Sequence, residues 1–135
     1  MLHAGENVED TFIARLDEQI LSLARNIGEK YRYEKLHSNA VETLSLRLFD
    51  AMSPLHGLPA RDRFLLQVAA ILHDIGKYVN LRRHYFFSYR LILSSDIIGF
   101  SEREKEVVAN IAHYHSKGTP SDLDGNFSRL DREEK

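Results

Sequence analysis

The stretch that most constrains this chain is the apolar run over residues 64–72, which ends directly in His73 and Asp74. Apolar residues occupy nearly every side of this run at helical spacing, which predicts a central, buried helix over 60–73. A charge left alone in apolar surroundings costs several kcal/mol, so the His-Asp pair needs a partner that satisfies both groups. A divalent metal ion is such a partner, because imidazole nitrogen and carboxylate oxygen suit Mn, Mg, Fe, Ni or Zn.

Amphipathic patterns on both sides of this run predict further helices. Apolar residues recur at helical spacing in four segments: 10–29, 34–51, 84–95 and a last helix that starts at a capping box in 101–104. No segment alternates with the period of a strand. The chain is therefore predicted to be all-α, a helical bundle of about five to six helices.

Three local details are predicted from the same patterns. In the helix over 34–51, one apolar stripe is expected to face the core, formed by Leu36, Ala40, Val41, Leu44, Leu48 and Met52. Residues 53–59, which hold two prolines and a glycine, are expected to form a loop. Gly76 is expected to allow a sharp exit from the helix that ends at His73.

Four histidines fall on the inward faces of separate predicted helices. They are His37, His73, His84 and His115. A single histidine on an apolar face is more often a core residue bonded to a backbone carbonyl. Four such residues would need four independent sets of partners. The set therefore favours a shared metal or phosphate site.

Basic residues close to the His-Asp pair are candidates for phosphate contacts. Lys77, Arg82, Arg83 and Lys117 lie near the motif or near His115 in the sequence. Their side chains can make charge-assisted hydrogen bonds to phosphate oxygens. The alternative for each of them is a solvated surface position.

Composition limits the class of protein. With 135 residues, the chain is expected to be one domain over 1–135, with a core at about 34–120. The absence of cysteine excludes a thiolate zinc site and disulfides, and suits a cytoplasmic protein. No signal peptide or membrane span is predicted. A net charge of −2 argues against general nucleic-acid binding.

An ordered set of motifs resembles a known family. The set comprises residues 72–77, His84 with residues 88–92, residues 94–101 and residues 114–117. With His37, it resembles the HD superfamily of metal-dependent phosphohydrolases. The match is closer to the helical HD domain of exopolyphosphatase and guanosine pentaphosphate phosphatase proteins. The resemblance spans about residues 34–120.

The resemblance implies roles for the candidate residues. His37, His73 and Asp74 would be the metal ligands, and His73 and Asp74 would be catalytic. His84 and His115 would line the pocket and hold a second metal or contact a phosphate. Lys77, Arg83 and Lys117 are further candidate phosphate contacts because of their proximity in the sequence. The superfamily's final aspartate has no matching motif here, and Phe87 stands where related sequences often have histidine. The chain is expected to be a piece of a longer protein.

Two functions remain open at this point. The first is a metal-dependent phosphohydrolase acting on a phosphoester, a nucleotide or polyphosphate. The alternative is a non-catalytic module that binds polyphosphate or guanosine polyphosphate, or that mediates dimerisation. The expected partners are a phosphorylated small molecule or polyphosphate, with a second copy of the chain or a separate catalytic domain.

Overall fold

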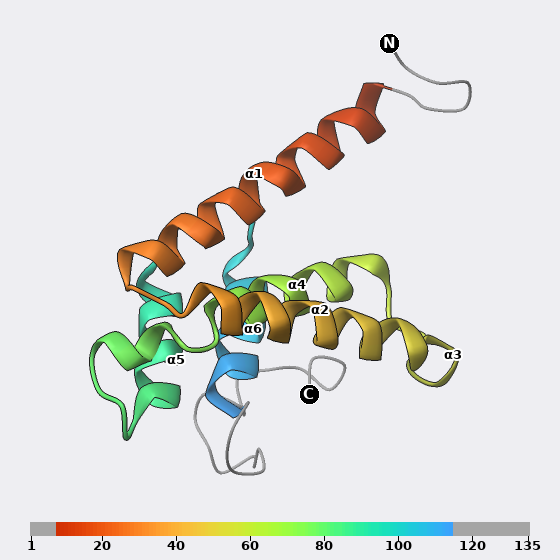
Figure 1. Cartoon of the computed structure of the whole chain (residues 1–135). Coiled ribbons are helices and arrows are strands. Elements are labelled where there is room, and N and C mark those ends of the chain that lie inside the picture. The colour runs from red at the N-terminus through yellow and green to blue at the C-terminus, as the bar shows by residue number, and fades with distance from the viewer. Residues whose placement is uncertain (1–7, 115–135) are drawn as a thin grey trace.

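A computed structural model of the chain describes residues 8–114, which are all-α and contain no strand (Figure 1). This confirms the predicted fold class. The elements are α1 (Val8–Lys30), α2 (Lys35–Ala51), α3 (Ser53–His56), α4 (Ala60–Leu72), the 3-10 helix η1 (Ile75–Tyr78), α5 (His84–Ser94) and α6 (Glu102–Tyr114). None of the helices in this part of the chain combines the length and apolarity needed to cross a membrane.

Helix α4 is the centre of the bundle, as the apolar run predicts. It packs against α1, α2 and α6, while α5 packs against α6 and η1. Every residue of α4 from Val68 to Leu72 is buried. The His-Asp pair therefore follows the most buried segment of the fold.

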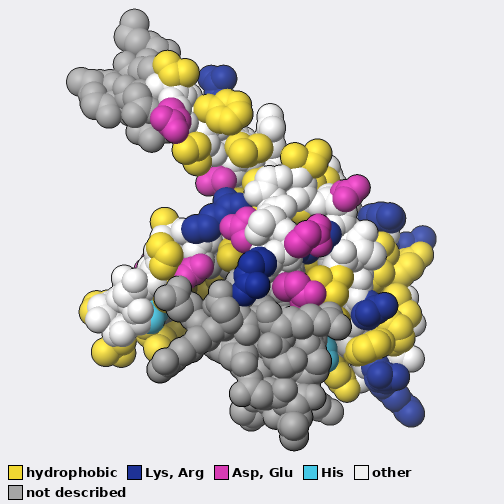
Figure 2. All heavy atoms as spheres, turned by 180° about the vertical axis from the view of Figure 1, so that it is seen from behind, with side chains coloured by type: hydrophobic (Ala, Val, Ile, Leu, Met, Phe, Trp, Pro, Cys, Tyr) yellow, Lys and Arg dark blue, Asp and Glu magenta, His cyan; other side chains and the backbone are white. Residues whose placement is uncertain are grey.

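Helix α1 is covered along only part of its length. Its C-terminal half contributes Ile20, Ala24 and Ile27 to the core. Its first turns project from the body as an arm that carries exposed hydrophobic side chains (Figures 1 and 2), with Val8 and Phe12 exposed.

A polar network joins α1, α2 and α4. Both terminal nitrogens of Arg25 donate to the carboxylate of Glu42 at 3.1 Å, and the amide of Gln67 donates to the same carboxylate at 2.8 Å. Glu42 is 8 % exposed, so these bonds compensate its desolvation. The hydrogen bonds that Arg25 donates to Glu42 are the largest cause of the raised pKa of Arg25.

The predicted core stripe of α2 is wrong. Leu36, Leu44 and Leu48 are 87 %, 63 % and 61 % exposed, and Ser38 and Glu42 are buried instead. The reason is the polar network, because it holds the Glu42 side of α2 against α4. Periodicity identifies an apolar face of a helix, but it does not say which face a neighbour covers.

The predicted loop over 53–59 contains the short helix α3. Pro54 lies in its first turn, where the missing N–H of proline removes no helical hydrogen bond. Gly57 ends the helix with a φ of 61°, in the left-handed region that favours glycine. The proline therefore starts a helix here.

An ion pair between Arg61 of α4 and Glu104 of α6 joins these two helices at one end of the bundle. The guanidinium of Arg61 donates from Nε to Glu104 Oε2 at 2.6 Å and from Nη2 to Glu104 Oε1 at 3.0 Å. The predicted capping box is confirmed, since Ser101 and Glu104 exchange two hydrogen bonds of 3.0 Å between side chain and backbone. The hydrogen bond from Arg61 holds the pKa of Glu104 below its usual value of 4.5.

Glu104→Gln is expected to destabilise the chain by about 1–2 kcal/mol at pH 7 and by less at pH 3. A carboxyl whose pKa is lower in the folded state stabilises above its unfolded value of 4.5, and this contribution disappears as the pH falls. Urea unfolding of both proteins at the two pH values measures the difference. The control is Glu102→Gln, because the Glu102 side chain is 90 % exposed. An effect of Glu104→Gln that is the same at both pH values would contradict the assignment.

Candidate metal centre

Three donor atoms converge where α2 crosses the end of α4. His37 lies in the first turn of α2, His73 is the C-terminal cap of α4, and Asp74 follows it. The distance from His37 Nε2 to His73 Nε2 is 3.3 Å, and each of these nitrogens lies 3.2 Å from Asp74 Oδ2. Residues 36 positions apart thus form a nearly equilateral triangle of ligand atoms.

The separations of the three donor atoms match those between neighbouring ligands of one metal ion. Two ligands about 2.1 Å from a divalent ion are separated by about 3.0 Å at an octahedral angle and about 3.4 Å at a tetrahedral angle. The observed separations of 3.2–3.3 Å fall between these values. Two imidazoles and one carboxylate on a single face also form a ligand set found in metalloenzymes. The residues present therefore fit a divalent metal ion.

Backbone carbonyls orient the imidazoles for this role. His73 Nδ1 donates to the carbonyl of Ala70 at 2.6 Å, and His84 Nδ1 donates to the carbonyl of Leu81 at 3.0 Å. Because a carbonyl only accepts, the lone pair of each neutral ring lies on Nε2, which faces Asp74. The Lys77 ammonium, 3.2 Å from Asp74 Oδ2, and a hydrogen bond between His37 Nε2 and His73 Nε2 offset part of the repulsion between these lone pairs and the carboxylate.

Two residues of the cluster are buried, and the third is accessible to solvent. His73 and Asp74 are 5 % and 7 % exposed, whereas the side chain of His37 is 47 % exposed. Water and a substrate can therefore approach from the side of α2. A metal ion held by three ligands would keep open positions facing that side.

A close contact between η1 and α5 fixes the segment that carries Asp74. The amide of Gly76 donates to Ser88 Oγ at 2.8 Å, and Ser88 is completely buried. A Cβ at position 76 would collide with the carbonyl oxygen of His84 and the amide nitrogen of Ser88. The backbone of Gly76 is not in the left-handed region, so close approach, rather than the predicted sharp turn, requires glycine here.

The remaining predicted site residues have different positions. His84 Nε2 lies 3.5 Å from Asp74 Oδ1, and Lys77 Nζ lies 3.2 Å from Asp74 Oδ2, so the structure brings both to the cluster. The guanidinium of Arg83 instead lies over the Phe86 ring at 4.7 Å. His115 and Lys117 lie outside the described residues.

Ser88 is the residue whose structural role the sequence did not reveal. It lies within one of the motifs that carry the family resemblance, but nothing in the residue pattern assigned it a partner. The available signal was a small polar residue on a largely apolar helix. In the structure its hydroxyl accepts the Gly76 hydrogen bond and so positions the turn after Asp74.

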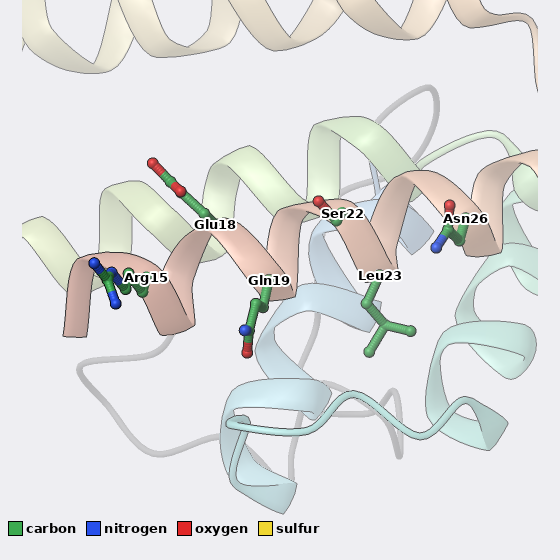
Figure 3. A pocket seen from close by; sticks show the side chains of 6 residues that line it. All are labelled: Arg15, Glu18, Gln19, Ser22, Leu23 and Asn26. Atoms are coloured by element: carbon green, nitrogen blue, oxygen red, sulfur yellow. The ribbon is translucent and has the colours of Figure 1, made fainter. Parts of the chain in front are cut away.

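An open pocket of about 520 Å³ lies elsewhere, along α1. Its lining side chains are Arg15, Glu18, Gln19, Ser22, Leu23 and Asn26. They come from a single helix and do not converge, since Glu18 and Gln19 point to different sides (Figure 3). None of them belongs to the His-Asp cluster. We assign no site to this pocket, because converging donor atoms are found at the cluster instead.

The fold and the cluster define an all-helical domain with a candidate divalent-metal centre. The family described as Ppx/GppA phosphatase, domain III, matches residues 21–134. The chain therefore belongs to this family, which confirms the predicted relation to exopolyphosphatase and guanosine pentaphosphate phosphatase proteins. The wider HD assignment and the metal roles of His37, His73 and Asp74 stay predictions.

One curated relative is the guanosine-5'-triphosphate,3'-diphosphate pyrophosphatase of Vibrio vulnificus (strain YJ016). It is 26% identical to this chain over 102 residues, which make up 73% of the chain and 20% of the relative. The chain thus spans about a fifth of the length of the curated relative it matches.

Proposed function

We propose that this domain is a phosphohydrolase that uses one divalent metal ion held by His37, His73 and Asp74. The observation that carries the proposal is the triangle of donor atoms with sides of 3.2–3.3 Å. Its support is chemical as well as geometric, because His73 and Asp74 are buried, the Ala70 carbonyl orients His73, and the imidazole of His37 is accessible to solvent. Family membership adds support for a phosphate-containing substrate.

The side chains around the triangle suit phosphoryl chemistry. When bound, a divalent ion supplies positive charge for phosphate oxygens and a water molecule of lowered pKa. Asp74 Oδ2 would hold the ion, while Asp74 Oδ1 lies 3.5 Å from His84 Nε2. We assign to His84 Nε2 the acceptance of a proton from the water whose oxygen bonds to phosphorus, while the bond between phosphorus and the leaving oxygen breaks and that oxygen keeps the electron pair. We assign a contact with a phosphate oxygen to the ammonium of Lys77, whose side chain is 35 % exposed and which pairs with Asp74 Oδ2 at 3.2 Å.

The substrate class follows from the same site and from the relative. The His37 side chain is 47 % exposed, so a phosphate group in solvent can reach it, and the cationic Lys77 favours an anionic ligand. The relative is named for a guanosine nucleotide that carries a triphosphate and a diphosphate. We therefore propose a nucleotide or polyphosphate as the substrate of this chain.

Metal content and phosphate release test the proposal. We expect about one divalent ion per chain by elemental analysis, and Mn-dependent phosphate release from a panel of nucleotides and polyphosphate. Both are expected to be lost in the double variant His73→Ala/Asp74→Ala. The control is His56→Ala, because His56 bonds to the Phe49 carbonyl between α2 and α3 and lies outside the cluster. Metal that persists in the double variant would refute the site.

A second candidate function is a non-catalytic polyphosphate or guanosine-polyphosphate binding module. The observation that favours it is the ligand set, since Asp74 is the one carboxylate in the metal-binding group found among residues 8–114. It predicts that metal and polyphosphate bind while the phosphate-release rate equals that of the double variant. Turnover that depends on Asp74 would exclude it.

A further inference from the structure

One oxygen of Asp74 has two possible cationic partners. Asp74 Oδ2 is a ligand atom of the proposed metal centre, and it lies 3.2 Å from the ammonium of Lys77. The side chain of Asp74 is 7 % exposed, so water screens its charge less than it screens a surface carboxylate. The oxygen that would bind a metal ion is therefore paired with a cation of the chain itself.

The backbone of η1 keeps Lys77 beside Asp74. The amide of Lys77 donates to the carbonyl of Asp74 at 3.0 Å, and side chains three positions apart lie on the same side of a 3-10 turn. The amide of Gly76 donates to Ser88 Oγ, which holds the same turn against α5. A change in the distance between the ammonium and Asp74 therefore requires a rotation of the side chains, and Lys77 has the longer and more exposed one.

A metal ion bound to Asp74 Oδ2 would lie close to this ammonium. Oxygen ligands lie about 2.1 Å from a small divalent ion. On either side of Oδ2, such an ion would be within about 5 Å of the ammonium in its observed position. Two cations at this separation repel each other, more strongly in a buried site than in water. Metal binding is therefore weakened unless the ammonium moves away from Asp74.

The Lys77 side chain can make this movement. It is 35 % exposed, and its four-carbon stem is flexible, so the ammonium can leave Oδ2 without becoming buried. A phosphate group bound beside Asp74 would offer the ammonium a new anionic partner. The metal ion and the phosphate therefore favour the same position of Lys77, away from Asp74.

We propose that Lys77 competes with the metal ion for Asp74 Oδ2 and thereby couples metal binding to phosphate binding. The ammonium pairs with Asp74 in the metal-free chain and with a phosphate oxygen in the metal-bound chain. Phosphate thus removes part of the competition and tightens metal binding. By thermodynamic linkage, the metal ion tightens phosphate binding by the same factor. This regulation rests on the metal centre proposed above.

Titration of the 135-residue chain with Mn²⁺, followed by calorimetry, tests the competition. Lys77→Met removes the charge and is expected to lower the dissociation constant of Mn²⁺ by about 10-fold or more. Lys77→Arg keeps the charge and is expected to stay within about 3-fold of the wild type. Circular dichroism checks that both variants keep their helices.

Two further variants control the titration. Arg63→Met loses the same charge, but Arg63 pairs with Asp50 at the surface and lies about 15 Å along α4 from His73, so the dissociation constant is expected to be unchanged. The double variant Lys77→Met/Asp74→Asn is expected to lose the tighter binding of Lys77→Met. That loss would assign the affected ion to Asp74.

The same Mn²⁺ titration in the presence of inorganic phosphate tests the coupling. Complexes between Mn²⁺ and free phosphate affect the wild type and Lys77→Met equally, so the comparison isolates the lysine. Phosphate is expected to lower the Mn²⁺ dissociation constant at least about 5-fold more in the wild type than in Lys77→Met. An equal effect of phosphate on both proteins would refute the coupling.

The results separate this inference from the metal centre on which it rests. If the wild type binds Mn²⁺ and Lys77→Met binds it no more tightly, Lys77 does not compete, although the metal centre stands. If neither protein binds Mn²⁺, both the competition and the metal centre are refuted. Binding by Lys77→Met alone would support the competition.

Discussion

Gly76→Ala is expected to destabilise the chain by about 3 kcal/mol or more. The added methyl group would overlap the backbone of His84 and Ser88, and backbone atoms inside a helix cannot rotate away as a side chain can. Relief therefore requires η1 to separate from α5, which also removes the bond from the Gly76 amide to Ser88 Oγ. Urea unfolding at neutral pH measures the loss of stability.

Gly28→Ala provides the matched comparison for this effect. A Cβ at position 28 also meets a close neighbour, but the neighbour is the ring of Tyr33, which can move. Gly28 lies inside α1, where alanine is a better helix former than glycine by about 1 kcal/mol. The net effect of Gly28→Ala is therefore expected to be less than half that of Gly76→Ala. If both substitutions lowered the free energy of unfolding equally, the overlap with the backbone of α5 would be no more destabilising than the overlap with the Tyr33 ring.

A divalent metal ion is expected to raise the midpoint of thermal unfolding by roughly 10 °C when its concentration is about 100 times the dissociation constant. The reason is linkage, because the converged donor atoms exist only in the folded chain. Asp74→Asn is expected to abolish most of this rise, since the amide oxygen is neutral and a weaker ligand. Thermal unfolding followed by circular dichroism, with and without Mn²⁺ or Zn²⁺, measures the effect.

Asp50→Asn is the control for this experiment, because Asp50 is an exposed carboxylate paired with Arg63 on the surface. It is expected to keep the full metal-dependent rise. If the metal raised the unfolding midpoint of Asp74→Asn as much as that of the wild type, the ion would bind at a site without Asp74. A metal-dependent rise of the unfolding midpoint in the wild type, without phosphate release, would support the metal centre and favour the non-catalytic module.

The sequence predicted the all-α class and the five long helices α1, α2, α4, α5 and α6 because their apolar patterns are regular, but it did not predict the short helices α3 and η1. It could not predict which side of α2 is covered. Leu36, Leu44 and Leu48 form the better apolar stripe by composition, yet Glu42 decides the rotation through partners 17 and 25 positions away. Such long-range polar contacts leave no local periodic signal.

The members of the candidate site were predictable in part. The adjacent His73 and Asp74 at the end of a buried helix indicated a cluster. His37 was expected on the inward face of α2, but its side chain is 47 % exposed and reaches the cluster from the solvent side. The structure brings these three together, while the metal itself stays a prediction. Arg83 was named from its proximity in the sequence, but its guanidinium lies over the Phe86 ring. The direction of a long, flexible side chain depends on contacts that the sequence does not specify.

The separation of the donor atoms along the chain has a consequence for how an ion distinguishes folded from unfolded protein. His73 and Asp74 are neighbours, so an unfolded chain can still offer both to a metal ion. His37 is 36 positions away, and bringing it to the pair in a flexible chain costs about 3 kcal/mol in loop-closure entropy. Folding docks α2 against α4 and removes this cost before the ion arrives. In the proposed metal centre, the accessible imidazole of His37, rather than the buried pair, would therefore give the ion most of its preference for the native chain.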